Sequence, residues 1–284
     1  MNNTIKLAFE ILNKNLLLTQ PLIVFIFILS ISSGMINRLQ NNLPLLLVYT
    51  LAMGLLFIAF VAGWGNMFKN AISSEINETL SDEEKRENAY NIGKYFFSGV
   101  GEYFLSVLGL SILYFFITAI ISFLIFKLGV QFIGIPNIDF AKLNEASATF
   151  ASSQNYFASL PVAEYVKLTK WLLLIMSVST GLQYITMWWF TSLFNDTKNP
   201  FLAISFGTKF FFKNILNIIV LALFLFLLHV ITSMINVVFV ANVILSLVAF
   251  IVFIYYITYY IVLIFLYYAK ETKNNINSRN DCIG

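Results

Sequence analysis

Residues 239–268 read FVANVILSLVAFIVFIYYITYYIVLIFLYY, a run of 30 residues without a single charged side chain. An α-helix rises about 1.5 Å per residue, so about 20 apolar residues cross the hydrocarbon core of a bilayer. This run exceeds that length, and Lys270 follows it closely. It therefore predicts a transmembrane helix that tilts strongly or emerges from the bilayer before it ends.

Five further apolar runs are long enough to span a bilayer, and charged or Asn-rich sequence separates each run from the next. They cover residues 16–36, 43–63, 103–126, 171–194 and 215–235. The composition agrees, because 59% of the residues are hydrophobic and only 11% are charged, against about a quarter charged in soluble domains. The sequence predicts an all-α polytopic membrane protein with six transmembrane helices, forming a single integral membrane domain over residues 1–284.

The first run could be mistaken for a signal peptide, because Lys6 and Lys14 precede it. The apolar part of a signal peptide has about 7 to 15 residues and ends at a small-x-small cleavage site. The run over 16–36 is longer, and its SISSGMI ending offers no such site. We expect it to remain as a permanent membrane anchor.

Basic residues predict the orientation of the chain, because they are retained on the cytoplasmic side of a membrane. With the N-terminus inside, twelve Lys and Arg residues lie on the inner side and five on the outer side. The outer residues are Arg38, Lys127, Lys142, Lys167 and Lys170. Both termini are therefore predicted to be cytoplasmic.

Short amphipathic segments precede pairs of spans and suggest an internal threefold repeat. They cover residues 4–16, 89–98 and 203–214, and GKYFF (93–97) resembles GTKFF (207–211). The ends of the second, fourth and sixth spans are also alike, as GNMFKN, FNDTKN and YAKETKN. We expect three copies of an interfacial helix plus a transmembrane hairpin. The alternative is that basic, aromatic-rich interfaces resemble one another by composition alone.

The wet faces of these segments carry lysines at helical spacing. In 4–16, Lys6, Glu10 and Lys14 share one face, and Ile5, Phe9, Leu12 and Leu16 share the other. The lysines predicted to contact the inner leaflet are Lys6, Lys14, Lys94, Lys209 and Lys213. Such helices could simply anchor the protein, or they could recognise lipid or a partner helix.

Two helix starts have recognisable caps. Ser81 and Glu84 form an S-x-x-E capping box, and Asn199 precedes Pro200 at the first helical position. Glycines at Gly54, Gly63, Gly65, Gly99 and Gly101 predict close contacts between helices. The outer segment 127–170 resembles two short helices broken at Pro161.

The residues needed for most enzyme chemistry are missing from the sequence. It has one histidine and one cysteine, Cys282, and we find no phosphate-binding loop, HExxH, GxSxG or Cys/His cluster. No catalytic residue, cofactor site or metal site is therefore expected, and the protein is not expected to be an enzyme. The lipid bilayer and other membrane proteins are the expected partners, and nucleic acid is not.

Two ionisable residues in or near spans are candidates for function. His229 lies well inside 215–235, and Glu102 lies near the inner end of 103–126. An ionisable group at membrane depth raises a functional hypothesis. A structural role is the alternative: a neutral imidazole hydrogen-bonded to a neighbouring helix, and a carboxylate solvated among headgroups.

The layout of six spans, Lys/Asn-rich amphipathic segments and a last span ending in LYYAK resembles that of a group of bacterial six-span membrane proteins of unknown function. Their relatives include the membrane domain fused to some glycerophosphodiester phosphodiesterases. The resemblance covers nearly the whole chain but includes no catalytic residue. It implies a bacterial inner-membrane protein with a scaffolding, lipid-related or export-accessory role; a small transporter or channel for a hydrophobic or neutral substrate is the alternative.

Overall fold

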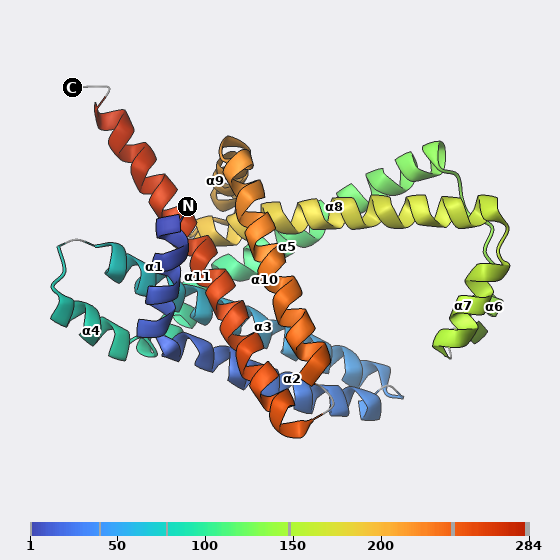
Figure 1. Ribbon diagram of the computed structural model, residues 1–284, viewed down its shortest axis with the longest axis horizontal. Coiled ribbons are helices and arrows are strands. Elements are labelled where there is room, and N and C mark those ends of the chain that lie inside the picture. Colours follow the sequence, from blue (N-terminus) through green and yellow to red (C-terminus); the bar gives the residue numbers. More distant parts are fainter. Residues whose placement is uncertain (1, 40, 78, 147–148, 240–241, 282–284) are drawn as a thin grey trace. The chain divides into compact units, whose positions relative to one another are not determined.

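The computed structural model describes residues 2–39, 41–77, 79–146, 149–239 and 242–281. Every regular element within these ranges is helical, so the prediction of an all-α protein is confirmed (Figure 1). In chain order the helices are α1 (Asn2–Lys14), the 3₁₀ helix η1 (Leu16–Thr19), α2 (Gln20–Leu39), α3 (Leu43–Ile76), α4 (Asp82–Tyr90), α5 (Lys94–Phe132), α6 (Phe140–Ala146), α7 (Phe150–Ser159), α8 (Val162–Asn195), α9 (Pro200–Lys213), α10 (Ile215–Phe239) and α11 (Val243–Asp281).

Six helical segments in these ranges are long and apolar enough to cross a membrane, which makes the chain a multi-pass membrane protein. The first, Leu16–Ile36, has the predicted limits, and most of the others extend further than predicted. The predicted start of the last span at 239 is wrong. Phe239 ends α10, and the Asn242 side chain accepts a hydrogen bond from the backbone N–H of Ile244 at 2.9 Å, which sets the start of α11.

The chain divides into two compact units. Unit 1 runs to Leu110 and resumes at Met187, and unit 2 comprises Ser111–Thr186. The prediction of a single membrane domain is not tested by this division and stays a prediction. One side of unit 1 is called the "basic end" below. It contains the starts of α2, α5 and α10, the ends of α3 and α8, and the α11 segment around Tyr268.

The core of unit 1 lies at the basic end. The ends of α3 and α8 and the α11 segment just before YAKETKN contribute one phenylalanine each: Phe68, Phe194 and Phe265. The ring centroid of Phe265 lies 5.8 Å from that of Phe68 and 6.0 Å from that of Phe194. The three segments therefore pack around one another and hold the spans together.

Helix α1 packs along α11 (Figure 1). Ala8, Ile11 and Leu12 are fully buried, while Phe9 and Leu16, predicted on the same face as Leu12, are exposed. The prediction of one apolar face was therefore wrong. An interfacial helix packed on a protein has two apolar sides, because one meets the protein and the other can meet lipid.

Glycines allow close helix packing at three of the five predicted positions. A Cβ at Gly63 or Gly65 would meet the Phe96 or the Phe194 ring, and one at Gly99 would lie 2.9 Å from the Ala62 carbonyl oxygen. The prediction was wrong for Gly54 and Gly101, where a Cβ would meet no atom within 4 Å. The sequence did not single out Gly207, where a Cβ would lie 2.6 Å from the Trp188 carbonyl oxygen.

The middle interfacial helix predicted over 89–98 was also wrong. Helix α4 ends at Tyr90, a turn follows, and α5 begins at Lys94, so GKYFF belongs to the start of a long helix. Asn91 and Gly93 explain the break, because both are poor helix formers. A short helix nevertheless precedes each pair of spans, namely α1, α4 and α9.

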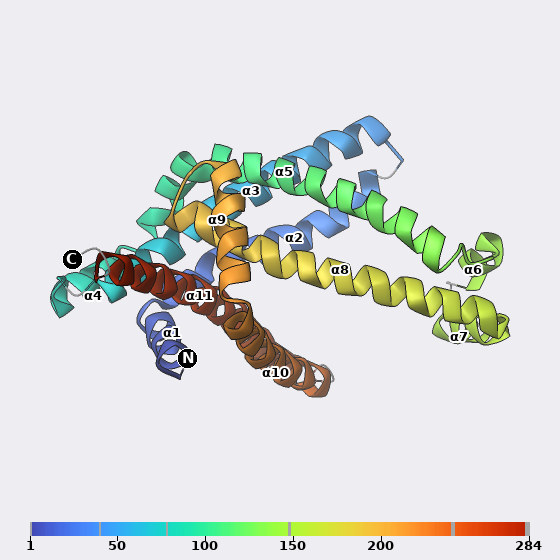
Figure 2. The same cartoon turned by 90° about the horizontal axis from the view of Figure 1, so that it is seen from above.

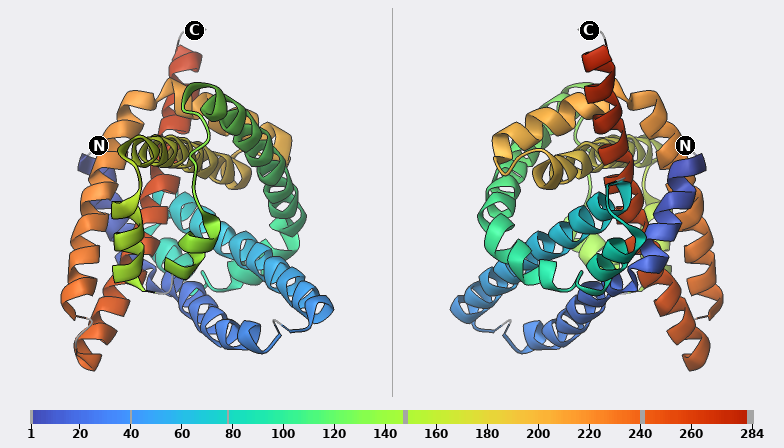
Figure 3. Two further views of the ribbon diagram at one scale, coloured as in Figure 1. Left: turned by 90° about the vertical axis from the view of Figure 1, so that its right-hand side faces the viewer. Right: turned by 90° about the vertical axis from the view of Figure 1, so that its left-hand side faces the viewer.

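Unit 2 contains the second part of α5, the short helices α6 and α7 and the first part of α8. The second part of α5 and the first part of α8 lie near each other within it (Figure 2), with the ring centroids of Phe126 and Trp171 6.1 Å apart. Helix α6 lies against α7 (Figure 3). The Trp171 indole N–H donates to the Gly134 carbonyl at 2.9 Å, and Gly134 has the positive φ of 81° that glycine tolerates. The predicted break at Pro161 and the short helix before it, α7, are confirmed, but the helix after Pro161 is the long α8 and not a short one.

Candidate functional site

His229 lies in the middle of α10, and its side chain is exposed. Its imidazole centroid is 6.1 Å from the ring of Tyr256 on α11. The expected hydrogen bond to a neighbouring helix stays a prediction, and the observed ring contact is with Tyr256, tilted by 39°. An exposed imidazole on an apolar helix is unusual, since ionisable groups within spans generally face protein or a water-filled cavity.

Glu102 lies in the first turns of α5 and is paired across the basic end. Its carboxylate oxygen is 2.8 Å from the Lys198 ammonium, in the connection between α8 and α9. This hydrogen bond, partly opposed by desolvation, raises the pKa of Lys198 above its usual value. The sequence reading found no basic neighbour for Glu102, because Lys198 is distant along the chain. The ion pair with Lys198 favours a structural role for the Glu102 carboxylate.

Tyr103 joins the same cluster and is almost completely buried. Lys69, at the end of α3, donates a hydrogen bond to the Tyr103 hydroxyl at 2.7 Å. The ammonium groups of Lys69 and Lys198 also lie 5.4 and 5.5 Å from the centre of the Tyr103 ring. Two cations and one carboxylate therefore surround a single phenol where three segments of the chain meet, an arrangement that locks helix ends together.

Asp196 is a further polar centre that the sequence reading missed. Its carboxylate accepts hydrogen bonds from the hydroxyl of Ser192 at 2.9 Å and from the hydroxyl of Tyr268 on α11. Tyr268 is buried in an aromatic cluster with Trp188 and Phe210. No local motif indicates this contact, because Asp196 and Tyr268 are 72 residues apart.

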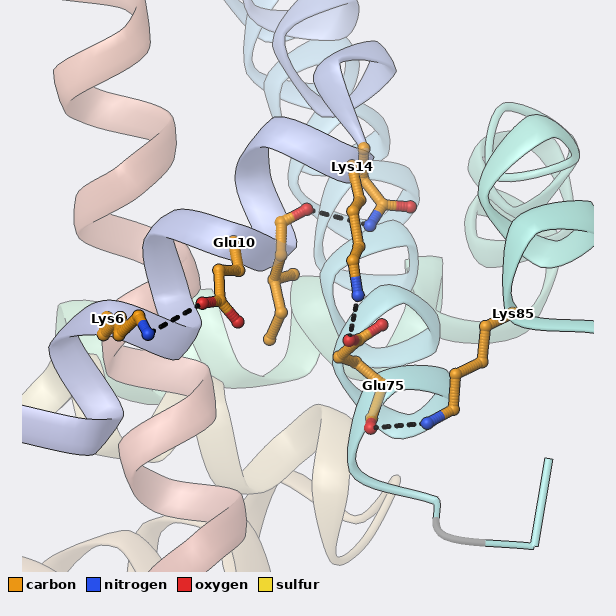
Figure 4. Close-up of polar contacts among 7 residues, drawn as sticks. Lys6, Glu10, Lys14, Glu75 and Lys85 are labelled. Carbon is orange, nitrogen blue, oxygen red and sulfur yellow. Dashed lines mark hydrogen bonds and ion pairs between the residues drawn. The ribbon is translucent and has the colours of Figure 1, made fainter. Parts of the chain in front are cut away.

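The five lysines predicted to meet the inner leaflet all have exposed side chains. On α9, Lys209 and Lys213 are exposed along with Phe206 and Phe212, whereas Ala203, Gly207 and Phe210 are buried. On α1, Lys6 pairs with Glu10 at 3.7 Å, and Lys14 pairs with Glu75 of α3 at 2.5 Å (Figure 4). The two helices thus combine a protein-facing side with exposed basic and aromatic side chains.

A cavity lined by both polar and apolar residues, which the sequence did not indicate, lies at the basic end. Its volume is about 1010 Å³, and its walls come from the end of α1, η1, the end of α3 and α4. Figure 4 shows Lys14, Glu75 and Lys85 from three of these elements. Helix α4 has the predicted capping box: Glu84 accepts hydrogen bonds from the Ser81 N–H and hydroxyl, and these lower the pKa of Glu84.

In the part of the chain that the structure describes, no group of three or more His, Cys, Asp and Glu side chains is arranged to hold a metal ion. Cys282 lies outside the described residues. In unit 1, ion pairs and hydrogen bonds between distant segments occur at the basic end, as between Lys14 and Glu75, Glu102 and Lys198, and Tyr268 and Asp196. This arrangement suits positioning of helices and binding of polar molecules at a membrane surface.

The fold defines a multi-pass α-helical membrane protein, and in unit 1 the ion pairs Lys14–Glu75 and Glu102–Lys198 join helix ends on one side of the spans. No family model matches the chain, and neither a curated protein nor a solved structure is significantly similar to it. The resemblance to bacterial six-span membrane proteins therefore stays a prediction.

Proposed function

We propose that the chain is a non-enzymatic protein of the bacterial cytoplasmic membrane that associates with anionic lipid and serves as a scaffold for other membrane proteins. Both termini and the basic end lie in the cytoplasm. The observation that carries this proposal is how the side chains are arranged around α1 and α9. One side of each helix is buried, while basic and aromatic side chains are exposed. Helices of this kind lie in the interface of a membrane.

The exposed side chains of α9 have the chemistry needed to recognise an anionic leaflet. Phe206 is 38% and Phe212 61% exposed, so both rings can enter the boundary between headgroups and acyl chains. Each lysine near an anionic membrane surface is attracted by about 1 kcal/mol. Lys6, Lys209 and Lys213 together would give a binding energy that depends on anionic lipid and weakens in salt.

Lipid dependence tests this proposal. The thermal unfolding temperature would be measured in nanodiscs of phosphatidylcholine with and without phosphatidylglycerol. We expect the anionic lipid to stabilise the native chain, and the triple substitution Lys6→Gln, Lys209→Gln, Lys213→Gln to remove most of that gain. A matched control, Lys127→Gln, Lys142→Gln, Lys170→Gln, removes the same charge at the predicted outer end. Equal losses in both variants would contradict the proposal.

The single cysteine provides a test of orientation. A membrane-impermeant maleimide should label Cys282 only after the cells are permeabilised. An Asn137→Cys variant that also carries Cys282→Ser should be labelled in intact cells, because residue 137 lies in the segment between α5 and α6. The reverse pattern would place the basic end outside.

A small transporter or channel for a hydrophobic or neutral substrate is the second candidate, and the exposed His229 beside Tyr256 is the observation in its favour. Polar groups at membrane depth often mark transport routes. Proteoliposomes carrying an imposed pH gradient would distinguish the two functions. Proton leakage that disappears in a His229→Ala variant would favour transport, whereas a tight membrane with both proteins would favour the scaffold.

A further inference from the structure

The cavity at the basic end contains more cationic than anionic side chains. Lys14, Lys85 and Arg86 line it, against the carboxylates of Glu75 and Asp82. The Glu75 side chain is only 12% exposed and is neutralised by Lys14 at 2.5 Å. The Lys85 ammonium lies 3.4 Å from the Glu75 backbone carbonyl, a long contact that leaves most of its hydrogen-bonding capacity for another acceptor.

Neutral side chains that can donate hydrogen bonds lie beside the cationic groups. Asn13, Gln20 and Asn88 also line the cavity. The Asn13 side-chain oxygen already accepts a hydrogen bond from the Tyr255 hydroxyl at 2.9 Å, so its amide N–H groups are the part left to meet a ligand. Arg86 is exposed, and its planar guanidinium matches the geometry of phosphate oxygens. The cavity is therefore suited to an anion with several acceptor oxygens.

The position of the cavity indicates where such an anion would come from. Leu16 and Leu17 of η1 line it as well, and Leu16 is 55% exposed. These residues lie at the start of the first span, Leu16–Ile36, where the chain passes from the interface into the apolar region. One cavity thus presents cationic and amide groups beside apolar side chains at headgroup depth. A phospholipid has the matching sequence of phosphate, glycerol and acyl chain.

We propose that this cavity binds the phosphate of an anionic phospholipid headgroup, with Lys85 and Arg86 as its principal cationic contacts. Asn13 and Gln20 would donate to the remaining polar groups of the headgroup, and Leu16 would contact the start of an acyl chain. The inference rests on the proposed lipid association and makes it specific, because it assigns one bound lipid to one cavity. The general attraction of α9 to the leaflet requires no such site.

Lipid retention tests the site directly. The full chain would be reconstituted in nanodiscs of equal parts phosphatidylglycerol and phosphatidylcholine, released into detergent and analysed by native mass spectrometry. We expect one phosphatidylglycerol per chain to be retained. Arg86→Gln changes an exposed side chain, so we expect it to preserve the fold and to reduce retention about tenfold or more, because a hydrogen-bonded charge pair is lost. Arg86→Lys should restore part of the retention, and Lys85→Gln with Arg86→Gln should abolish it.

The Lys209→Gln, Lys213→Gln variant separates this inference from the proposed function. We expect it to retain the single phosphatidylglycerol although its unfolding temperature responds less to anionic lipid. Retention that is unchanged in the Lys85→Gln, Arg86→Gln variant, or equal for phosphatidylcholine, would overturn the site and leave the general lipid association standing. Titration with sn-glycerol 3-phosphate and inorganic phosphate distinguishes the source of the anion. Binding that competes with phosphatidylglycerol would support the phosphate site but replace the lipid by a soluble ligand.

Discussion

The two ends of α3 differ sharply in the surroundings of their large apolar side chains. Between Leu43 and Phe57 the large side chains are mainly exposed, as at Leu51 with 67%, whereas Met67 and Phe68 at the basic end are 1% exposed. Helix α11 has the same asymmetry, with Val243 88% exposed and Leu263 fully buried. Within unit 1, therefore, α3 and α11 bury their large side chains mainly at the basic end, and the large side chains near their other ends are mostly exposed.

This difference shows that hydrophobicity alone does not locate the protein core in a membrane protein. Lipid tails are as apolar as leucine, so an apolar residue gains little by moving from lipid into a helix interface. Close packing, glycine contacts and hydrogen bonds decide where helices associate. All three occur at the basic end, where Gly99, Gly207 and the carboxylate of Asp196 lie. Substitutions there should affect stability far more than substitutions at the opposite end.

The largest difference is expected between Trp188→Ala and Leu51→Ala. Trp188 is fully buried and packs against Phe210 and Tyr268, so its truncation should lower the free energy of unfolding by about 3–5 kcal/mol. Leu51 is exposed to the lipid region, and its truncation should change stability little. Reversible unfolding in mixed micelles would measure both. Similar losses for the two variants would contradict the assignment of the core to the basic end.

Removal of the Asp196 carboxylate should have the next largest effect. The Asp196→Ala variant leaves the hydroxyl of buried Tyr268 without its acceptor, so we expect a loss of about 1.5–3 kcal/mol in the free energy of unfolding. The double variant Asp196→Ala, Tyr268→Phe removes both partners and should recover part of that loss. If the double variant is no more stable than Asp196→Ala, the hydrogen bond is not what stabilises this end.

A pair of glycine substitutions sharpens the comparison with the smallest change in volume. A Cβ at Gly207 would lie 2.6 Å from the backbone oxygen of Trp188, so Gly207→Ala should destabilise by about 1–3 kcal/mol. At Gly54 a Cβ meets no atom within 4 Å, and Gly54→Ala should stabilise by up to about 1 kcal/mol through its helix propensity. Thermal unfolding of the two variants should therefore shift in opposite directions.

The smallest effect is expected at the exposed rim of the basic end. Glu102 raises the pKa of Lys198 above the usual 10.5 in the folded chain. Stability from this pair is present below pH 10.5 and is lost as the pH rises through the raised pKa. Unfolding temperatures measured across this alkaline range should fall more for the native chain than for Lys198→Gln. Parallel curves would show that the pair adds nothing.

Hydrophobicity and length predicted most of the fold, because membrane spans require long uninterrupted apolar runs. The all-α class, the limits of the first span and the caps at Ser81 and Asn199 could be read directly from the sequence. The middle interfacial helix could not, since 89–98 has helical spacing but contains Asn91 and Gly93 at the break. The segment 89–98 resembles the segment 203–214 only in its types of residue, and residue types alone do not determine where a helix begins.

The candidate site depended on contacts between distant segments. Lys209 and Lys213 could be predicted as exposed from their spacing, but no periodicity pairs Glu102 with Lys198 or Asp196 with Tyr268. The cavity likewise needs α1, α3 and α4 to meet, and only tertiary packing brings them together. The sequence by itself determined which segments enter the membrane, because transfer into lipid is a property of each segment. The tertiary structure decided which ends converge and which charges meet, because close packing depends on shape and on partners far away in the chain.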